Sequence, residues 1–250
     1  MLTNKQIKLI NSLHSKKGRK ENDLFLVEGE KSLLELLKSD FQIEFFVLNQ
    51  EHPDLADQIS QHASNASIYC VEASEIQKLS TLVNNQIGLA VVRQKEFPPF
   101  KISDPYTIVL DGIRDPGNLG TIIRICDWYG FKQLVLSEDC TEFYNPKVII
   151  SSMGSFSRIE FHYANLTTFF EEHSNYKKIG AVLTGENIHK YQFPEKGFII
   201  LGNESNGIRE EILEVLDERI TIPAFGEAES LNVGISTAII ADNLKRFILS

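Results

Sequence analysis

The chain has 250 residues, of which 42% are hydrophobic and 24% are charged, and its formal net charge is −9 at pH 7. This composition is typical of a globular protein with a sizeable core, and the acidic balance argues against indiscriminate binding to nucleic acid. No apolar run approaches the roughly 18 residues of a membrane helix, and the first residues show no signal-peptide pattern, so we expect a cytoplasmic protein with no membrane partner.

The cysteines and histidines give no sign of a metal centre or of a disulfide framework. Cys70, Cys126 and Cys140 are odd in number and widely spaced, and none belongs to a CxxC motif. The six histidines are scattered without the spacing of metal ligands. This usage predicts buried thiols in a reducing compartment, and no metal.

The N-terminal part of the chain alternates strand-like and helical segments. Thr3 and Gln6 form a capping-box pattern ahead of an apolar stripe, which predicts a short amphipathic helix. The basic stretch KKGRKEND follows and is interpreted as a loop. Beyond it we expect strands at residues 24–27, 43–48, 67–71 and 87–93, with helices at 32–38, 53–63 and 72–79. This alternation predicts a small α/β domain over residues 1–95.

The stretch QKEFPPFKISDP contains three prolines and no sustained apolar period, which is typical of a stiff linker. We therefore place a linker at residues 96–105 and a second α/β domain at residues 106–250. In this domain we expect strands at 106–110, 133–136, 178–183, 197–201 and 219–222, and helices at 120–129, 146–153, 166–173, 208–216 and 231–249. Open α/β sheets bind ligands at the carboxyl ends of their strands.

Three loops of the second domain follow strands and are rich in glycine and polar residues. They lie within VLDGIRDPGNLGTIIRICDWYGF, LGNESNGI and IPAFGEAESLNVG, which begin at Val109, Leu201 and Ile222. Neither a dinucleotide-binding fingerprint nor a phosphate-binding P-loop is present, because the first loop lacks GxGxxG and the second lacks the following Lys-Ser/Thr. Backbone groups in such loops can still cradle a ligand.

Polar side chains at the ends of these elements predict one shared site. Each also has a structural explanation: Asn118 and Ser230 as helix caps, Glu204 as a charge in a first helical turn, and Arg124 as a surface ion-pair partner. Taken together, we interpret them as a site, because the parallel strands bring their loops to one edge of the sheet. The set is Asn118, Arg124, Asn203, Glu204, Ser230 and Asn232.

Two further features leave alternatives open. Small residues on the last helix, among them Gly234 and Ala241, allow close packing either within the domain or against a second copy, and the residues alone slightly favour the first. The basic stretch near the N-terminus is either solvated surface or a patch that contacts phosphates.

Read in order, three motifs closely resemble the SpoU (TrmH-like) branch of the SPOUT RNA ribose 2′-O-methyltransferases. They are DPGNLGTIIRICDWYGF from Asp115, LGNESNGI from Leu201 and IPAFGEAESLNVGISTAI from Ile222. The stretch NPKVIISSMGSF from Asn145 fits the segment between the first two motifs. LHSKKGRKENDLFLVEGEKSLLELL, from Leu13, is similar to the substrate-binding domain that often precedes this fold. The resemblance covers nearly the whole chain.

The resemblance implies an α/β fold in which a C-terminal trefoil-knot domain grips S-adenosylmethionine. It also implies a homodimer through that C-terminal domain. A small L30e-like α/β domain would precede it and present basic residues to RNA, and these are Lys16, Lys17, Arg19 and Lys20. Ribosomal RNA is the preferred substrate, transfer RNA is the alternative, and a catalytically inactive RNA-binding or ribosome-assembly factor of the same fold is a third interpretation.

The roles implied by the resemblance fall on two groups of residues. Those implied for catalysis are Asn118, Arg124, Glu204, Ser230 and Asn232. Those implied for binding S-adenosylmethionine are Thr184, Gly202, Asn203, Ile222 and Leu231. The implied reaction moves a methyl group to a ribose 2′-hydroxyl. Arg124 is either the base or an electrostatic group, and the high pKa of arginine side chains favours the second.

Overall fold

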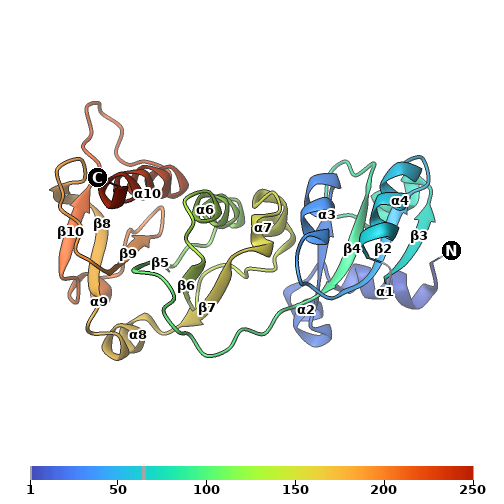
Figure 1. Ribbon diagram of the computed structural model, residues 1–250, viewed down its shortest axis with the longest axis horizontal. Helices are drawn as coiled ribbons and strands as arrows, with labels where there is room; N and C mark the ends of the chain where they lie inside the picture. The colour runs from blue at the N-terminus through green and yellow to red at the C-terminus, as the bar shows by residue number, and fades with distance from the viewer. Residues whose placement is uncertain (1, 64–65, 250) are drawn as a thin grey trace. The chain divides into compact units, whose positions relative to one another are not determined.

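The computed structural model describes residues 2–63 and 66–249, which form two compact units (Figure 1). Unit 1 comprises Met1–Glu96 and Glu142–Ser157, and unit 2 comprises Phe97–Thr141 and Arg158–Ser250. The segment Glu142–Ser157 therefore packs in unit 1, although the sequence places it inside the second domain. The predicted limits of the domains, 1–95 and 106–250, stay a prediction.

Unit 1 contains a mixed sheet of four strands in the order β1-β4-β2-β3. β2 and β3 are parallel, whereas β4 is antiparallel to both β1 and β2. The strands are β1 (Leu24–Glu28), β2 (Ile43–Asn49), β3 (Ser67–Val71) and β4 (Gly88–Arg93). The small α/β domain predicted from the sequence is confirmed.

The helices of unit 1 begin with the one that the capping box predicts. Thr3 accepts a hydrogen bond from the backbone of Gln6, and the Gln6 side chain accepts one from the backbone of Thr3. The interpretation of the basic stretch as a loop is wrong: it forms a helix, because Ser15 caps its start and Asp23 ends it in the left-handed region at φ 53°. The helices are α1 (Asn4–Ser12), α2 (Lys16–Asn22), α3 (Glu30–Leu37), α4 (Pro53–His62), α5 (Ala73–Leu79), α7 (Pro146–Ser151) and the 3₁₀ turn η1 (Ser155–Ser157).

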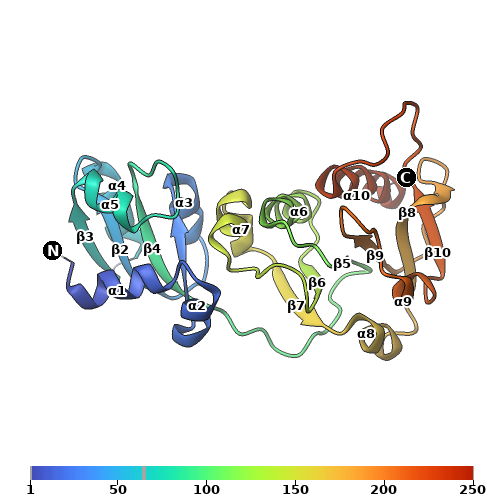
Figure 2. The ribbon, with the colours of Figure 1, turned by 180° about the vertical axis from the view of Figure 1, so that it is seen from behind.

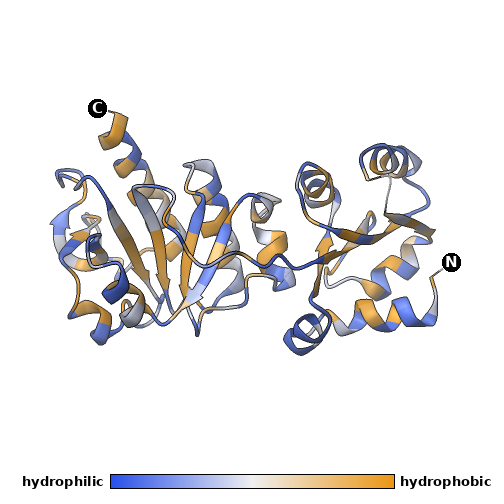
Figure 3. Cartoon of the chain, turned by 60° about the horizontal axis from the view of Figure 1, so that its bottom comes forward, coloured by the Kyte–Doolittle hydropathy of each residue, from blue (hydrophilic) through white to orange (hydrophobic). Residues whose placement is uncertain are grey.

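Unit 2 contains a parallel sheet of six strands in the order β10-β8-β9-β5-β6-β7. β5 is buried along its whole length, as is typical of parallel strands covered on both faces, and much of this sheet is orange in Figure 3. The strands are β5 (Tyr106–Asp111), β6 (Gln133–Ser137), β7 (Glu160–Ala164), β8 (Lys177–Asn187), β9 (Gly197–Gly202) and β10 (Glu218–Thr221). β7 was not expected from the sequence, because this edge strand is only partly buried and lacks a clear apolar pattern.

Four helices accompany this sheet, and two of them pack against each other beside the predicted site. They are α6 (Pro116–Trp128), α8 (Leu166–Glu172), α9 (Glu210–Leu213) and α10 (Val233–Leu249). α6 and α10 are neighbours in both Figure 1 and Figure 2. A Cβ atom at Gly234 would lie 2.9 Å from Cγ2 of Thr121, so a larger residue there would displace the Thr121 side chain where the two helices meet.

Two observations concern chemistry elsewhere in the described chain. Cys126 and Cys140 are buried as expected, whereas Cys70 is exposed. Within residues 2–63 and 66–249, no helix is long and apolar enough to cross a membrane, and no cluster of side chains could hold a metal ion.

Candidate active site

The start of α6 is capped by a residue other than the one considered from the sequence. Asp115 accepts a hydrogen bond of 2.8 Å from the backbone of Asn118, and Pro116 occupies the first helical turn, where a missing N–H costs nothing. The side chain of Asn118 is therefore free to reach away from its own helix. Capping by Asp115 is what makes Asn118 available for a site.

Asn118 lies in the middle of a chain of hydrogen bonds that joins the three motifs. Its Nδ2 donates to Oε1 of Glu204 over 2.5 Å, and its Oδ1 accepts from Nδ2 of Asn232 over 2.9 Å. Asn232 also accepts from the backbone of Gly234 at the start of α10. The predicted meeting of these loops is thus present, and we refer to Asn232, Asn118 and Glu204 as the amide–carboxylate chain.

Arg124 and Ser230 lie outside the amide–carboxylate chain. Arg124 is exposed on α6, two turns after its start, and it forms no ion pair with any residue that the structure describes. Ser230 is exposed in the stretch that precedes α10, two residues before Asn232. The suggested roles of Arg124 as an ion-pair partner and of Ser230 as a helix cap are not observed, so both side chains are available to a substrate.

A cavity of about 800 Å³ lies beside the amide–carboxylate chain, entirely within unit 2. It is lined by the middle of β8, the loop from Leu201 to Ile208, the stretch from Arg219 to Leu231 and the side of α10. Seven predicted site residues line it: Thr184, Gly202, Asn203, Glu204, Ile222, Ser230 and Leu231. Asn118, Arg124 and Asn232 do not line it, so the site has a cavity and a separate polar rim.

The cavity fits an adenosyl cofactor in its chemistry. Apolar side chains such as Ile220 and Ile240 line it beside the carboxylates of Glu204 and Glu229. Between residues 224 and 231 no backbone group is hydrogen-bonded to another described residue, so this stretch offers unpaired donors and acceptors to a ligand. Apolar walls with a few convergent polar groups are what a flat base with polar edges requires.

The loop from Gly202 to Ile208 is closely folded. The backbones of Asn203 and Gly207 exchange hydrogen bonds of 3.0 and 2.8 Å, and a Cβ atom at Gly202 would lie 2.1 Å from the carbonyl carbon of Gly207. The Asn203 side chain donates to the carbonyl oxygen of Gly112 over 2.7 Å. Asn203 therefore shapes the wall of the cavity, and its direct contact with a cofactor stays a prediction.

Sequence reasoning missed a buried acidic residue next to this loop. Asp111, the last residue of β5, is 1% exposed, and its carboxylate accepts hydrogen bonds from the backbone and side chain of Arg209. The hydrogen bonds to Asp111 raise the pKa of Arg209. A single acidic residue at the end of the largely apolar strand YTIVLD was the available signal, because an unpaired carboxylate is not tolerated where the strand is buried.

Asp139 is the second acidic neighbour of Arg209. Burial alone would raise its pKa, but hydrogen bonds from Ser137 and Arg114 and the charge of Arg209 outweigh burial and hold the pKa below its usual value. Asp139 thus remains ionised and adds to the negative environment that holds Arg209 in place.

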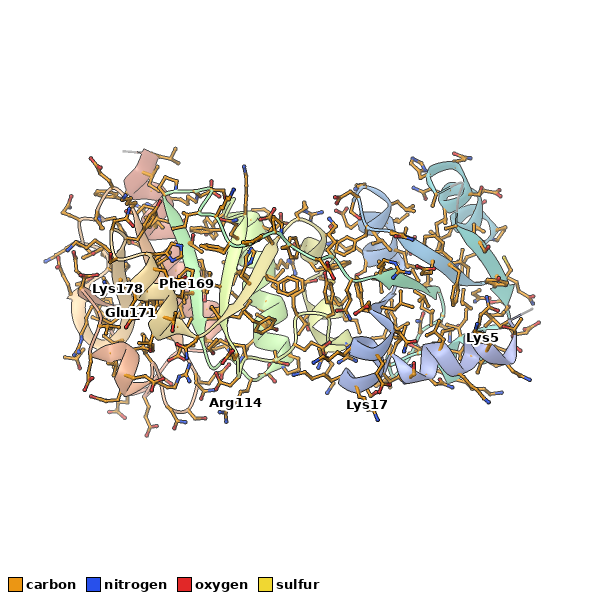
Figure 4. The ribbon with its side chains drawn as sticks, turned by 90° about the horizontal axis from the view of Figure 1, so that it is seen from below. Lys5, Lys17, Arg114, Phe169, Glu171 and Lys178 are labelled. Atoms are coloured by element: carbon orange, nitrogen blue, oxygen red, sulfur yellow. The ribbon has the colours of Figure 1, made fainter. Side chains whose placement is uncertain are left out.

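The basic residues predicted to contact RNA divide into two groups. Lys16, Lys17 and Lys20 are exposed on α2, and Figure 4 labels Lys17 on this helix. Arg19 is only 2% exposed: its guanidinium donates to Glu142 over 3.0 and 2.5 Å and to the carbonyl oxygen of Leu13 over 2.8 Å. The prediction for Arg19 is corrected, because α2 turns this side chain into the core of unit 1.

Two family models match consecutive parts of the chain. The model of the SpoU rRNA Methylase family matches residues 105–242, and that of the MRM3-like substrate binding domain matches residues 4–90. The chain is 30% identical over 246 residues to the 23S rRNA (guanosine(2553)-2′-O)-methyltransferase RlmP of Bacillus subtilis, which covers 97% of this chain and 96% of the relative.

The chain is also similar to solved structures of RNA methyltransferases. A putative RNA methyltransferase of the TrmH family from Porphyromonas gingivalis superposes with a TM-score of 0.87 at 31% identity, covering 98% of this chain and 99% of that one. The AdoMet-bound rRNA methyltransferase from Sinorhizobium meliloti superposes with a TM-score of 0.85 at 27% identity, covering 100% and 97%. The predicted fold class is confirmed.

Proposed function

Because the chain belongs to the SpoU rRNA Methylase family, we propose that it methylates the ribose 2′-hydroxyl of a guanosine in 23S ribosomal RNA. The chain is an S-adenosylmethionine-dependent rRNA ribose 2′-O-methyltransferase, in agreement with the sequence-based preference for ribosomal RNA. The guanosine and the 23S RNA come from the names of the similar enzymes. The observation that carries the proposal is the amide–carboxylate chain at the rim of the cofactor-sized cavity.

S-adenosylmethionine supplies an electrophilic methyl group when it is bound. In this proposal the backbone of residues 224–231 would hydrogen-bond the polar edge of its base, and Gly202, Ile222 and Leu231 would form the pocket, with Thr184 at its border. Gly202 is essential to the pocket, because a side chain there would collide with Gly207. The knot implied by the resemblance stays a prediction.

The amide–carboxylate chain orients the ribose that accepts the methyl group. Asn232 holds the amide of Asn118, and Asn118 in turn holds the carboxylate of Glu204. Because both partners of Asn118 are fixed, its remaining N–H and the free oxygen of Glu204 point in defined directions. Fixed polar groups of this kind accelerate a reaction chiefly by positioning the nucleophile.

Arg124 stabilises negative charge on the attacking oxygen or binds the adjacent phosphate. Its guanidinium is exposed and unpaired among the described residues, so no internal carboxylate competes for it. An arginine remains protonated at neutral pH, which suits an electrostatic group rather than a base. The hydroxyl proton then leaves to water or to a phosphate, either directly or through Ser230, whose hydroxyl gives up its own proton as it accepts one.

A homodimer through unit 2 is supported by apolar residues on the two packed helices. Trp128 on α6 is 83% exposed, and Ile235 on α10 is 53% exposed. Large exposed apolar side chains on adjacent helices are typical of protein interfaces. Arg124 lies one turn before Trp128 on the same side of α6 and would then approach the second copy. Sedimentation equilibrium that finds only monomer at micromolar concentration would contradict this part of the proposal.

The test of the function combines donor binding with mapping of the methylated nucleotide. The protein should bind S-adenosylmethionine in calorimetry and transfer its labelled methyl group to unmodified 23S ribosomal RNA. In cells without the protein, one ribose 2′-O-methyl group should disappear from that RNA. Donor affinity without any loss of methylation would point to another RNA, whereas absence of donor affinity would favour the inactive RNA-binding factor.

A further inference from the structure

The loop from Gly202 to Ile208 is held at both ends by Asp111, and we propose that Asp111 and Arg209 are the positioning pair of the methyl-donor site. In this inference the pair sets the loop for donor binding and for presenting Glu204 to the amide–carboxylate chain. The inference rests on the proposed function for its biological meaning, but the geometry of the loop can be tested without any reaction.

Asp111 reaches the first end of the loop through its backbone and the second end through its side chain. In the parallel ladder between β5 and β9, Asp111 pairs with Gly202, where the loop begins. Its carboxylate accepts hydrogen bonds from Arg209, directly after the loop, over 2.8 Å from the backbone N, 2.7 Å from Nε and 2.5 Å from Nη2. One residue therefore closes the loop.

Hydrogen bonds inside the loop connect its base to its tip. Asn203 and Gly207 are paired through their backbones, and the Asn203 side chain is tied to the carbonyl oxygen of Gly112. The tip consists of Glu204, Ser205 and Asn206, and the Asn203 carboxamide oxygen accepts from the backbone of Ser205 over 2.9 Å. These hydrogen bonds connect the tip of the loop to its base, so in this inference the position of Glu204 depends on the contact between Asp111 and Arg209.

The electrostatics make this contact hard to replace. The side chain of Asp111 is 0% exposed, whereas that of Arg209 is 43% exposed and also lies 3.7 Å from Asp139. A buried carboxylate without its cation is strongly unfavourable, so loss of Arg209 drives Asp111 to find water or to take up a proton. Either response opens the base of the loop, which is also a wall of the cavity.

An ion pair with the same pattern of contacts, although its carboxylate is 30% exposed, allows this role to be separated from ordinary stabilisation. The carboxylate of Asp217 accepts hydrogen bonds from both the backbone N and Nζ of Lys178, over 2.8 and 2.9 Å, as Asp111 does from Arg209. Lys178, labelled in Figure 4, lies near the amino end of β8, and neither residue lines the cavity. The variant Lys178→Gln is therefore the control for Arg209→Gln.

The experiment compares the full-length chain with Arg209→Gln, Arg209→Lys, Asp111→Asn, the double variant Asp111→Asn/Arg209→Gln, and Lys178→Gln. Hydrogen exchange without any ligand reports on the amides of Asn203, Gly207 and Arg209, calorimetry gives the Kd for S-adenosylmethionine, and steady-state kinetics separate kcat from the KM for RNA. Thermal unfolding monitors global stability.

We expect Arg209→Gln to expose the loop amides to exchange, to weaken donor binding at least about tenfold and to lower kcat, while the KM for RNA stays within about twofold. Arg209→Lys should recover part of the donor affinity, because it keeps the charge but loses the two-point contact. The double variant should bind the donor better than Asp111→Asn and Arg209→Gln combined additively, because it removes both charges.

Unchanged loop exchange and donor affinity in both Arg209→Gln and Asp111→Asn would overturn the inference. So would equal losses of donor affinity in Arg209→Gln and Lys178→Gln, because the pair would then act only through stability. If the wild-type chain neither binds S-adenosylmethionine nor methylates RNA, the proposed function fails. The positioning of the loop is judged separately, from the exchange of its amides.

Discussion

Two ion pairs, one in each unit, bury a charge of opposite sign. In unit 1 the buried partner is the cation, since the side chain of Arg19 is 2% exposed and that of Glu142 is 18% exposed. In unit 2 the buried partner is the anion, since Asp111 is 0% and Arg209 is 43% exposed. In both pairs the structure supplies further hydrogen bonds to the buried group, as burial of a charge requires.

The two pairs differ in the chain segment to which the less buried partner belongs. Glu142 begins the segment Glu142–Ser157, which contains no predicted site residue and packs in unit 1. Arg209 ends the loop that lines the cavity and carries Glu204. The same type of interaction is therefore expected to contribute to stability in unit 1 and to donor binding in unit 2. Location relative to the cavity, and not strength, decides the function of a buried ion pair.

The largest effect that would test this comparison is expected for Arg19→Met. Removal of the guanidinium leaves Glu142 without its cation and two carbonyl oxygens without a donor. The free energy of unfolding of unit 1 should fall by about 3 kcal/mol, the lower end for a broken buried pair, because Glu142 is partly exposed. Urea unfolding followed by circular dichroism measures this change.

The control for Arg19→Met is Lys20→Met, a neighbouring residue that is exposed on the same helix. It should leave the unfolding transition in place. The donor Kd should stay at the wild-type value in both variants, because every residue that lines the cavity belongs to unit 2. Weakened donor binding in Arg19→Met alone would show that the division between stabilising and functional pairs is wrong.

A somewhat smaller effect is expected for Asn118→Ala, which sharpens the comparison within unit 2. Asn118 contacts Glu204 but does not line the cavity. Its loss should lower kcat by about 100-fold and leave the donor Kd within about twofold, the reverse of the pattern expected for Arg209→Gln. Asn243→Ala, on the far end of α10, is the control. Equal loss of donor affinity in the Asn118 and Arg209 variants would remove the distinction between orienting the substrate and holding the loop.

The third effect concerns the exposed lysines of α2, which differ from Arg19 on the same helix because Arg19 is buried. Replacing Lys16, Lys17 and Lys20 by Gln should weaken RNA binding and reduce the slope of log affinity against log salt by about one unit for each lysine that contacts a phosphate. Donor binding should not change. A salt slope identical to that of the wild-type chain would show that α2 does not contact RNA and would leave unit 1 without its predicted patch.

The sequence was sufficient to predict which loops meet, because parallel strands place their carboxyl ends at one edge. In the structure, Asp111 at the end of β5 pairs with Gly202 at the end of β9, so the loops that follow the two strands begin side by side. Asn118, Glu204 and Asn232 could be named in advance because of their combination: each has a structural explanation by itself, but the three lie at element ends that parallel strands bring to one edge. The three motifs give the residue types and their order along the chain. The pairing of adjacent parallel strands then brings these residues close together.

The direction of individual side chains could not be predicted from the sequence. Arg19 and its exposed neighbours are equally basic, and what turns Arg19 inward is a carboxylate 123 residues away in the chain. Asp115 and Asn118 can both cap a helix, and only the structure shows that Asp115 does so and frees Asn118. Both outcomes depend on long-range packing, which local propensity does not encode.

The smallest effect is expected at His162, where burial acts on a titratable group that forms no ion pair among the described residues. His162 lies in β7 with the rings of Phe100 and Phe97 at 4.9 and 6.0 Å. Burial lowers its pKa from the usual 6.5, against the opposing charge of Glu160. As the pH falls below about 6.5, the unfolded chain takes up the proton first, so the free energy of unfolding decreases until the pH reaches the lower folded pKa.

In His162→Phe this acid-side loss of stability should shrink, whereas His189→Gln, an exposed histidine of the same unit, should retain it. Urea unfolding at pH 7.5 and pH 5.5 compares the three chains. A pH dependence that survives in His162→Phe would instead assign the titration to another group, and burial at β7 would then have no measurable consequence for stability.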